Sequence, residues 1–195
     1  MFFGGIDLSI GDKNTSLCFI EDSKKIKIVF LKDKISEKEI IEEVKKYEPL
    51  YIAIDAPITW RKIKDRKEDK ILRRYFIERK IKVPGILPFY VKSMYELSKR
   101  GKRIYLKLRK ITEVLETHPT ASLRAIGFKE NYKKNKKELK KILNKLKEKL
   151  DKISLIKNHN HLDSLFCALF SLYYYKKEKI FLARKKVPYG IIREL

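Results

Sequence analysis

The sequence predicts an α/β protein: a mixed five-stranded sheet flanked by helices, with the strands in the spatial order three-two-one-four-five. The first observation is that three apolar segments, residues 2–10, 15–21 and 25–32, are joined by GDKN and DSK. Joints this short and of turn composition indicate an antiparallel meander. The second observation is that the next two strands each follow a helical segment, and a strand returning through a helix normally lies parallel to its neighbour. Only the second strand should therefore be antiparallel to the rest.

The first crossover is a helix predicted over residues 36–47. Ser36 and Glu39 have the spacing of a capping box, and three branched apolar residues form one stripe behind them. Pro49 ends the helix, because proline cannot continue the hydrogen-bond ladder. The fourth strand follows at residues 51–55.

The chain between the fourth and fifth strands is dense in charge and is predicted to be helical. Residues 61–82 form its first helical segment, and a second helix is predicted over residues 89–100 with Gly101 as its end. We treat the region of about 61–110 as a helical insertion into a single domain spanning 1–195.

The C-terminal half is predicted to hold one further core strand and three helices. The strand covers residues 113–117, a short helix covers 121–126, and a long helix covers 135–152 with its leucines and isoleucines at helical spacing. The last helix begins near Asn160, and a tail strand follows at residues 180–183.

The charge balance indicates a polyanionic partner. Lys and Arg number 48 against 25 Asp and Glu, so the formal net charge is +23. Such an excess favours nucleic acid or an acidic membrane. A surface adapted to heat is the alternative, since the chain lacks Gln and is rich in Lys, Glu and Ile. That adaptation usually adds charges of both signs, however.

We expect a cytoplasmic protein that does not enter a membrane. The residues after Met1 lack the pattern of a signal peptide. The longest apolar stretch, residues 162–175, contains Asp163 and is too short to span a bilayer. Cys18 and Cys167 each lie inside an apolar run, which is typical of core cysteines rather than metal ligands.

Acidic residues stand near the carboxyl ends of three predicted strands. Asp7, Asp55 and Glu116 hold these positions, and Asp163 lies in the first turn of the last helix. If strands one, four and five are parallel neighbours, their ends share the sheet edge at which α/β proteins gather ligand sites. Clustered carboxylates require a cation, and oxygen ligands suit Mg²⁺ or Mn²⁺. Each acid also has a structural alternative: a turn, a cap, a surface strand residue, or, for Asp163, a capping box with Asn160.

Several segments resemble the motifs of a known family. Three strands, a helix and a strand ending in an acid is the order of the ribonuclease H-like fold. The segments GIDLS, IDAPITW, ETHPTASLRAIG and HLDSLFCALFSLYYY resemble successive motifs of a family of predicted nucleases with that fold, catalogued as a domain of unknown function. Arg66, Asp69 and Arg73 resemble that family's Arg/Asp helix. The resemblance covers nearly the whole chain and implies one ribonuclease H-like domain.

The resemblance also implies a catalytic site. Asp7, Asp55 and Asp163 would bind Mg²⁺ or Mn²⁺, with Glu116 beside them, and the reaction would be phosphodiester hydrolysis. Related resolvase-like nucleases often carry two acids three residues apart in the final helix. Here the earlier position is Asn160, so both a one-metal and a two-metal site stay open.

His159 is a further catalytic candidate. It precedes Asp163 by four residues and shares its helix face if the helix begins early. His118 is a second residue that could move protons. The structural alternatives are a solvated loop for His159 and a turn before Pro119 for His118.

Two basic segments could hold the backbone of DNA or RNA. Residues 61–82 and 129–152 each contain 11 basic and 4 acidic residues. A solvated helix face is the alternative for any single lysine. Four residues of these segments are expected to bind nucleic acid: Arg66, Arg73, Lys133 and Lys137.

Two other functions fit the same features. A nucleic-acid binding protein without catalysis would keep the basic surface and need no metal. A phosphotransferase of the actin and sugar-kinase superfamily shares the fold and binds phosphate at its first hairpin. Asp7 and Thr15 resemble residues of that hairpin. Such enzymes usually need two domains of this kind. Metal-dependent cleavage and ATP turnover would separate the three.

Overall fold

The computed structural model describes residues 1–58, 66–85, 92–128, 130–184 and 187–195. The strands in these ranges form one sheet in the order β6-β3-β2-β1-β4-β5-β8-β7. The strands are β1 (Phe2–Asp7), β2 (Ser16–Glu21), β3 (Ile26–Asp33), β4 (Tyr51–Asp55), β5 (Glu113–Thr117), β6 (Leu150–Asp151), β7 (Ile180–Arg184) and β8 (Tyr189–Ile192). The first five lie in the predicted order, and among them only β2 is antiparallel to its neighbours. The predicted core of the sheet is confirmed.

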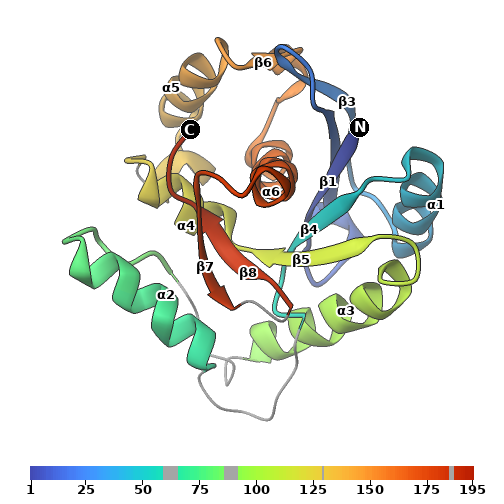
Figure 1. Ribbon diagram of the computed structural model, residues 1–195, viewed down its shortest axis with the longest axis horizontal. Coiled ribbons are helices and arrows are strands. Elements are labelled where there is room, and N and C mark those ends of the chain that lie inside the picture. Colours follow the sequence, from blue (N-terminus) through green and yellow to red (C-terminus); the bar gives the residue numbers. More distant parts are fainter. Residues whose placement is uncertain (59–65, 86–91, 129, 185–186) are drawn as a thin grey trace.

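Helices cover both faces of this sheet (Figure 1). They are α1 (Glu37–Tyr47), α2 (Lys67–Glu78), α3 (Lys92–Leu108), α4 (Pro119–Ala125), α5 (Lys136–Leu146) and α6 (His159–Lys176), with short 3₁₀ turns η1 (Asp12–Asn14), η2 (Glu130–Lys133) and η3 (Ile153–Leu155). The helices α4, α5 and α6 pack on one face, while α1 and α3 pack on the other. The helix α2 packs against the β7–β8 hairpin. The predicted capping box of Ser36 and Glu39 begins α1.

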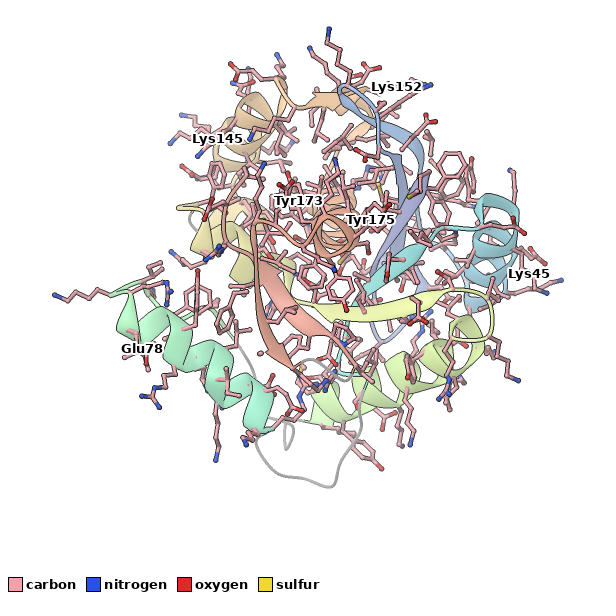
Figure 2. The ribbon with its side chains drawn as sticks, viewed as in Figure 1. Lys45, Glu78, Lys145, Lys152, Tyr173 and Tyr175 are labelled. Atoms are coloured by element: carbon pink, nitrogen blue, oxygen red, sulfur yellow. The ribbon has the colours of Figure 1, made fainter. Side chains whose placement is uncertain are left out.

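The helix α6 is the centre of the core. Figure 1 shows it nearly end-on, enclosed by strands and by α4 and α5. Its residues 161–173 are all buried, and Figure 2 shows the inward position of Tyr173, which is 4% exposed. Both cysteines, Cys18 on β2 and Cys167 on α6, are buried as expected. None of the helices in the described part of the chain has the length and apolar character needed to cross a membrane.

The prediction that a helix ends at Gly101 is wrong. The helix α3 continues to Leu108, and Gly101 is buried within it. A Cβ added at Gly101 would lie 3.0 Å from the Cβ of Ala56. The glycine therefore allows α3 to approach the segment after β4 rather than ending the helix. The start predicted for this helix lies outside the described residues.

The helix predicted over residues 135–152 is also too long. It ends at Leu146, and Leu150 begins β6, which pairs in parallel with β3. The backbone amide of Ile26 donates a hydrogen bond to the carbonyl of Lys149 at 3.0 Å. The open edge of β3 offers backbone partners to this segment, and pairing there satisfies more backbone groups than another helical turn.

The sheet has eight strands rather than five because its edges are extended. The predicted tail strand at 180–183 is confirmed as β7, but β8, which lies between it and β5, was not predicted. An isolated glycine, Gly190, weakens the strand signal there. In the structure a Cβ at Gly190 would lie 2.2 Å from the carbonyl oxygen of Phe181, so the glycine is what permits the hairpin to close.

The helix α6 lies directly on β1 at Gly5. A Cβ at this position would lie 2.1 Å from the backbone nitrogen of Ala168 and 2.2 Å from the carbonyl oxygen of Ser164. Only glycine fits such a contact, because two backbones meet and neither can rotate away. Ser171 strengthens it by donating a hydrogen bond to the carbonyl of Gly4 at 2.9 Å. The contact fixes the position of α6 two residues before the end of β1.

We predict that Gly5→Ala lowers the free energy of unfolding by about 3 kcal/mol, because the added methyl group forces two backbones apart. The measurement is urea unfolding. Gly11→Ala is the matched control: nothing lies within 4 Å of its added Cβ, so its effect should stay within about 0.5 kcal/mol. Equal stability of the two variants would contradict the packing described here.

Candidate active site

Two of the predicted acids meet at the carboxyl edge of the sheet. The strands β1 and β4 are parallel, and Asp7 pairs directly with Asp55. Successive residues of a strand point to opposite faces, so both carboxylates point to the face covered by α6, as Phe3 and Ala53 do. The parallel neighbours inferred from the crossover pattern thus bring the two acids together.

Asp163 joins them from α6. Its side chain is 0% exposed. It accepts a hydrogen bond from the Tyr132 hydroxyl at 2.5 Å, and the Nζ of Lys133 lies 2.9 Å from its second oxygen. We call Asp7, Asp55 and Asp163 the acid cluster.

Burial and mutual repulsion raise the pKa values of Asp7 and Asp55 within this acid cluster. Burial raises the pKa of Asp7 well above its ordinary value, and the charges of Asp163 and Asp55 raise it further. Burial likewise raises the pKa of Asp55 to about 7; Lys133 opposes this shift, and the charges of Asp163 and Glu116 add to it. The cluster therefore holds protons at pH values where isolated carboxylates are ionised, and it favours any cation that enters it.

Lys133 is the cation that lies at the cluster. Burial opposes its charge, but the charges of Asp163 and Asp55 outweigh this and raise the pKa of Lys133 above its ordinary range. Its side chain is 41% exposed, so the stem reaches in from the surface turn η2. Within the described ranges, no group of three or more His, Cys, Asp or Glu side chains is already arranged to hold a metal ion. An ion could bind Asp7 and Asp55 from the cluster, and would take Asp163 only by replacing Lys133.

Glu116 lies on the other side of the sheet edge. It is one register position away from Asp55, paired with Ile54, and so points to the face covered by α3. Its carboxylate accepts from Arg66 at 2.6 Å and from Arg184 at 3.0 Å. The amide of Ile58 lies 3.3 Å from the same group. Glu116 is thus neighbour to the acid cluster but is held by two guanidinium groups.

The helix α6 begins early enough to place His159 on the face of Asp163, and the capping-box alternative for Asp163 is not found. The helix α6 begins at His159, which places it one turn before Asp163. The N-cap is Asn158, whose side chain accepts from the amide of His161 at 2.9 Å. Asp163 therefore lies beyond the first turn and does not form a capping box with Asn160. Burial lowers the pKa of His159, while the charge of Asp163 acts against this shift.

His118 is buried at the start of α4. Burial lowers its pKa to about 4, and the charge of Lys133 acts in the same direction. The imidazole is therefore neutral near pH 7. Among the described residues its Nδ1 has no hydrogen-bond partner. A neutral ring with a free nitrogen could accept a proton beside the acid cluster.

A cavity of about 240 Å³ opens beside the acid cluster. It lies between the strand ends and α3, which contributes Met94 and Leu97. Its polar lining consists mainly of groups already described: Asp7, Asp55, Glu116, His118, Lys133 and Arg66. The cavity gives a small ligand access to both sides of the sheet edge.

The residues expected to bind nucleic acid lie in different surroundings. Arg66 is 8% exposed and donates two hydrogen bonds to Asp69, at 2.7 and 2.8 Å, besides its bond to Glu116. Arg73 is half-buried on α2, and Lys137 is exposed in the first turn of α5. Lys133 lies at the acid cluster. Arg66 and Lys133 line the same cavity, and Arg73 and Lys137 are not part of its lining.

Two contributors to the site were not foreseen. Tyr132 bonds Asp163 from 31 positions away, and Arg184 reaches Glu116 from 68 positions away. Neither has a local sequence signal, because only the folded chain brings these residues to the sheet edge. The side chain of Arg184 comes from β7, close to the unpredicted β8.

The chain was compared with known proteins once this geometry was clear. The profile of a family described as "Protein of unknown function (DUF429)" matches residues 5–179. The chain belongs to this family. No curated protein gives a match.

Two solved structures are similar over nearly the whole chain. One is Thermus thermophilus RuvC in complex with a Holliday junction substrate, with a TM-score of 0.55 and 12% identity. The other is a Thermus thermophilus RuvC structure, with a TM-score of 0.51 and 12% identity. Each match covers 98% of this chain and 100% of the RuvC chain. The two RuvC structures have the ribonuclease H-like fold, and this member of the family shares that fold.

The raised pKa of Asp55 predicts a pH dependence in chelator. Folded Asp55 keeps its proton up to about pH 7, whereas the unfolded residue loses it near 3.8. The folded state thus binds more protons between these values, and its stability falls as the pH rises through this window. Urea unfolding across this pH window should show that the free energy of unfolding falls less with rising pH in Asp55→Asn than in the parent. The exposed Glu148→Gln is the control; an unchanged slope in Asp55→Asn would contradict the shift.

Lys133 is predicted to stabilise the metal-free protein. Lys133→Met keeps the aliphatic stem and removes the charge, which leaves the buried Asp163 carboxylate without its cation. We expect the free energy of unfolding in chelator at pH 8 to fall by about 1–3 kcal/mol, toward the lower end because Lys133 is partly exposed. Lys137→Met, on an exposed residue, should leave stability within about 0.5 kcal/mol of the parent. If both variants unfold alike, Lys133 does not neutralise the cluster.

Proposed function

We propose that this protein is a metal-dependent nuclease that hydrolyses phosphodiester bonds in nucleic acid with Mg²⁺ or Mn²⁺. In this proposal residues 1–195 act as a single ribonuclease H-like domain with a helical insertion at about 61–110. The observation that carries the proposal is the convergence of Asp7, Asp55 and Asp163 at the carboxyl edge of the sheet. Three clustered carboxylates, of which Asp163 is fully buried and Asp7 and Asp55 have raised pKa values, have no evident structural purpose, but they are suited to a cation.

The donor set fits Mg²⁺ or Mn²⁺. Both ions prefer oxygen ligands, and the cluster offers three carboxylates. Asp7 and Asp55 pair across two adjacent strands and face the same side, so they are the first pair of ligands. Asp163 would join when Lys133 withdraws. When bound, the ion would supply charge to a phosphate oxygen and acidity to a water molecule.

The surrounding side chains have defined parts in this proposal. Neutral His159, one turn from Asp163, is placed to take a proton from the attacking water, and neutral His118 could do so from the cavity wall. Lys133, once released from Asp163, would bind a phosphate oxygen. Glu116 acts through its ion pairs, which position Arg66 at the cavity. Contacts of Arg73 and Lys137 with the nucleic-acid backbone remain part of the proposal.

A nucleic-acid binding protein without catalysis is the second candidate. The observation that favours it is Lys133, whose ammonium group already neutralises the acid cluster. A permanent internal cation would make a metal unnecessary. Metal-dependent cleavage of a nucleic acid substrate distinguishes the two functions.

The central test is Asp7→Asn. The substitution keeps the size of the side chain and removes a charge, so it should abolish Mn²⁺ binding in calorimetric titration and any cleavage. Metal-free stability should stay equal or rise, because repulsion among the acids is relieved. If Asp7→Asn binds Mn²⁺ like the parent, or melts much lower in chelator, Asp7 is a structural residue and the proposal fails.

Two other acids serve as controls for Asp7→Asn. Glu116→Gln should retain Mn²⁺ binding but lower stability, because it weakens the partner of the buried Arg66. Asp151→Asn, on the exposed end of β6, should change neither property. Loss of Mn²⁺ binding in Glu116→Gln would place the metal site on the other side of the sheet edge.

A further inference from the structure

The helix α3 carries a concentrated positive charge that the two basic segments do not include. Residues 92–110 contain eight basic residues and one acidic residue. The net charge of +7 equals that of each longer segment, 61–82 and 129–152, within fewer positions. Six of these cations line one open depression of about 910 Å³ together with Leu106: Lys99, Lys102, Arg103, Lys107, Arg109 and Lys110. We call these six residues the α3 basic face.

Helical periodicity places these cations on one side. Ser98, Gly101, Ile104 and Leu108 are buried against the sheet, so the residues between them face outward. Arg100 is the exception; it turns inward, is 5% exposed, and binds the β1–β2 loop. The α3 basic face is therefore an outer surface and not part of the helix packing.

A solvated helix adapted to heat has a different pattern. The outer face of α1 alternates lysine with glutamate, as in the ion pairs Lys38–Glu42 and Lys46–Glu43. The depression on α3 has no acidic residue among the described residues that line it. Two carboxylates pair with the face: Glu37 of α1 pairs with Arg103 and lies 3.7 Å from Lys107, and Glu96 lies 3.3 Å from Lys99. The six cations thus outnumber the acids paired with them, and the face keeps a net positive charge.

The position of the face relates it to the candidate active site. Met94 and Leu97, one turn earlier on α3, line the cavity beside the acid cluster. The cations on the helix itself, from Lys99 to Lys107, extend for about 12 Å at 1.5 Å per residue. Arg109 and Lys110 follow just past the end of α3 at Leu108. By contrast, α5 lies on the opposite side of the view in Figure 1, and Figure 2 shows Lys145 there.

Among the residues of α3 that the structure describes, no freely exposed aromatic ring is available for stacking with bases. Tyr95 and Tyr105 are half-buried, and each ring is covered by a cation: Lys99 lies 4.3 Å from the first and Arg109 lies 5.7 Å from the second. Single-strand binding combines cations with exposed aromatic rings, whereas duplex binding relies on contacts with the phosphates. A straight row of cations on a rigid helix suits a duplex.

We propose that the α3 basic face binds the phosphate backbone of duplex nucleic acid and leads it to the candidate active site. This inference rests on the proposed function in taking nucleic acid as the ligand. It concerns binding alone, and it assigns the main backbone contacts to α3 rather than to residues 61–82 or 129–152.

The test measures the affinity for a 20-base-pair DNA duplex across a salt series in chelator. The triple variant Lys102→Gln, Arg109→Gln, Lys110→Gln should lower the slope of log K against log salt by about 2.7, since each lost phosphate contact removes about 0.9. The affinity at low salt should fall at least tenfold. Circular dichroism and melting temperature confirm that the variant is folded.

Two triple variants with the same change of charge are the controls. Lys38→Gln, Lys45→Gln, Lys46→Gln removes charge from α1 and should leave the slope unchanged. Lys136→Gln, Lys140→Gln, Lys145→Gln removes the same charge from α5 and should also leave the slope unchanged. If the salt dependence of binding becomes weaker in the α5 variant and stays unchanged in the α3 variant, the α3 assignment is wrong. Tighter binding of a 20-nucleotide single strand than of the duplex would also overturn it.

The outcomes separate this inference from the proposed function. If the parent binds no nucleic acid at low salt, both fail. If the parent binds and cleaves but the α3 variant does so with unchanged slope, only the inference fails. If Asp7→Asn neither binds Mn²⁺ nor cleaves, yet keeps duplex binding that the α3 variant loses, then α3 is a binding surface independent of the chemistry.

Discussion

The arrangement of the site depends on one steric constraint, the contact between the backbones of β1 and α6 at Gly5. A side chain at Gly5 would overlap Ser164 and Ala168 on α6. Because the helix lies this close, Asp163, next to Ser164, comes to the end of β1 where Asp7 is located. A helix held farther from the strand would carry Asp163 away from the strand ends. The absence of a Cβ at Gly5 thus determines how closely Asp163 on the helix approaches Asp7 on the strand.

The same close packing creates the electrostatic problem that the site must solve. Asp7 and Asp55 are brought against the buried Asp163, so the charged forms of Asp7 and Asp55 are disfavoured. Lys133 offsets part of this cost from a surface turn. Because successive residues of a strand point to opposite faces, Glu116 lies on the other side of the sheet from the acid cluster. There the buried Arg66 neutralises it. A single sheet edge therefore holds two differently compensated groups of acids.

The parts of the fold that could be predicted are those specified by local patterns. The alternation of apolar residues, the Ser36–Glu39 capping box and the short hairpin joints predicted the order of the five core strands. The acid cluster followed from strand order, because parallel neighbours end at one edge. The neutralising group was not accessible in this way: Lys133 is 30 positions from Asp163 in the sequence, and its place depends on the turn η2. The end of α5 and the strand β8 were missed for a similar reason, since the partner that decides them is an edge strand distant in sequence.

The distribution of charge unites the acidic centre with the basic surface. A phosphate backbone is repelled by a cluster of carboxylates, so a polyanion reaches this sheet edge only if cations compensate both sets of charges. Lys133 contributes at the centre itself, where the stem is exposed but the ammonium group lies beside Asp163. The cations of the α3 basic face contribute along the approach, beginning two residues after Leu97 at the cavity wall. The net charge of +23 is thus not a uniform property of the surface. It is concentrated where α3 places more cations than carboxylates near a site whose own charge is negative.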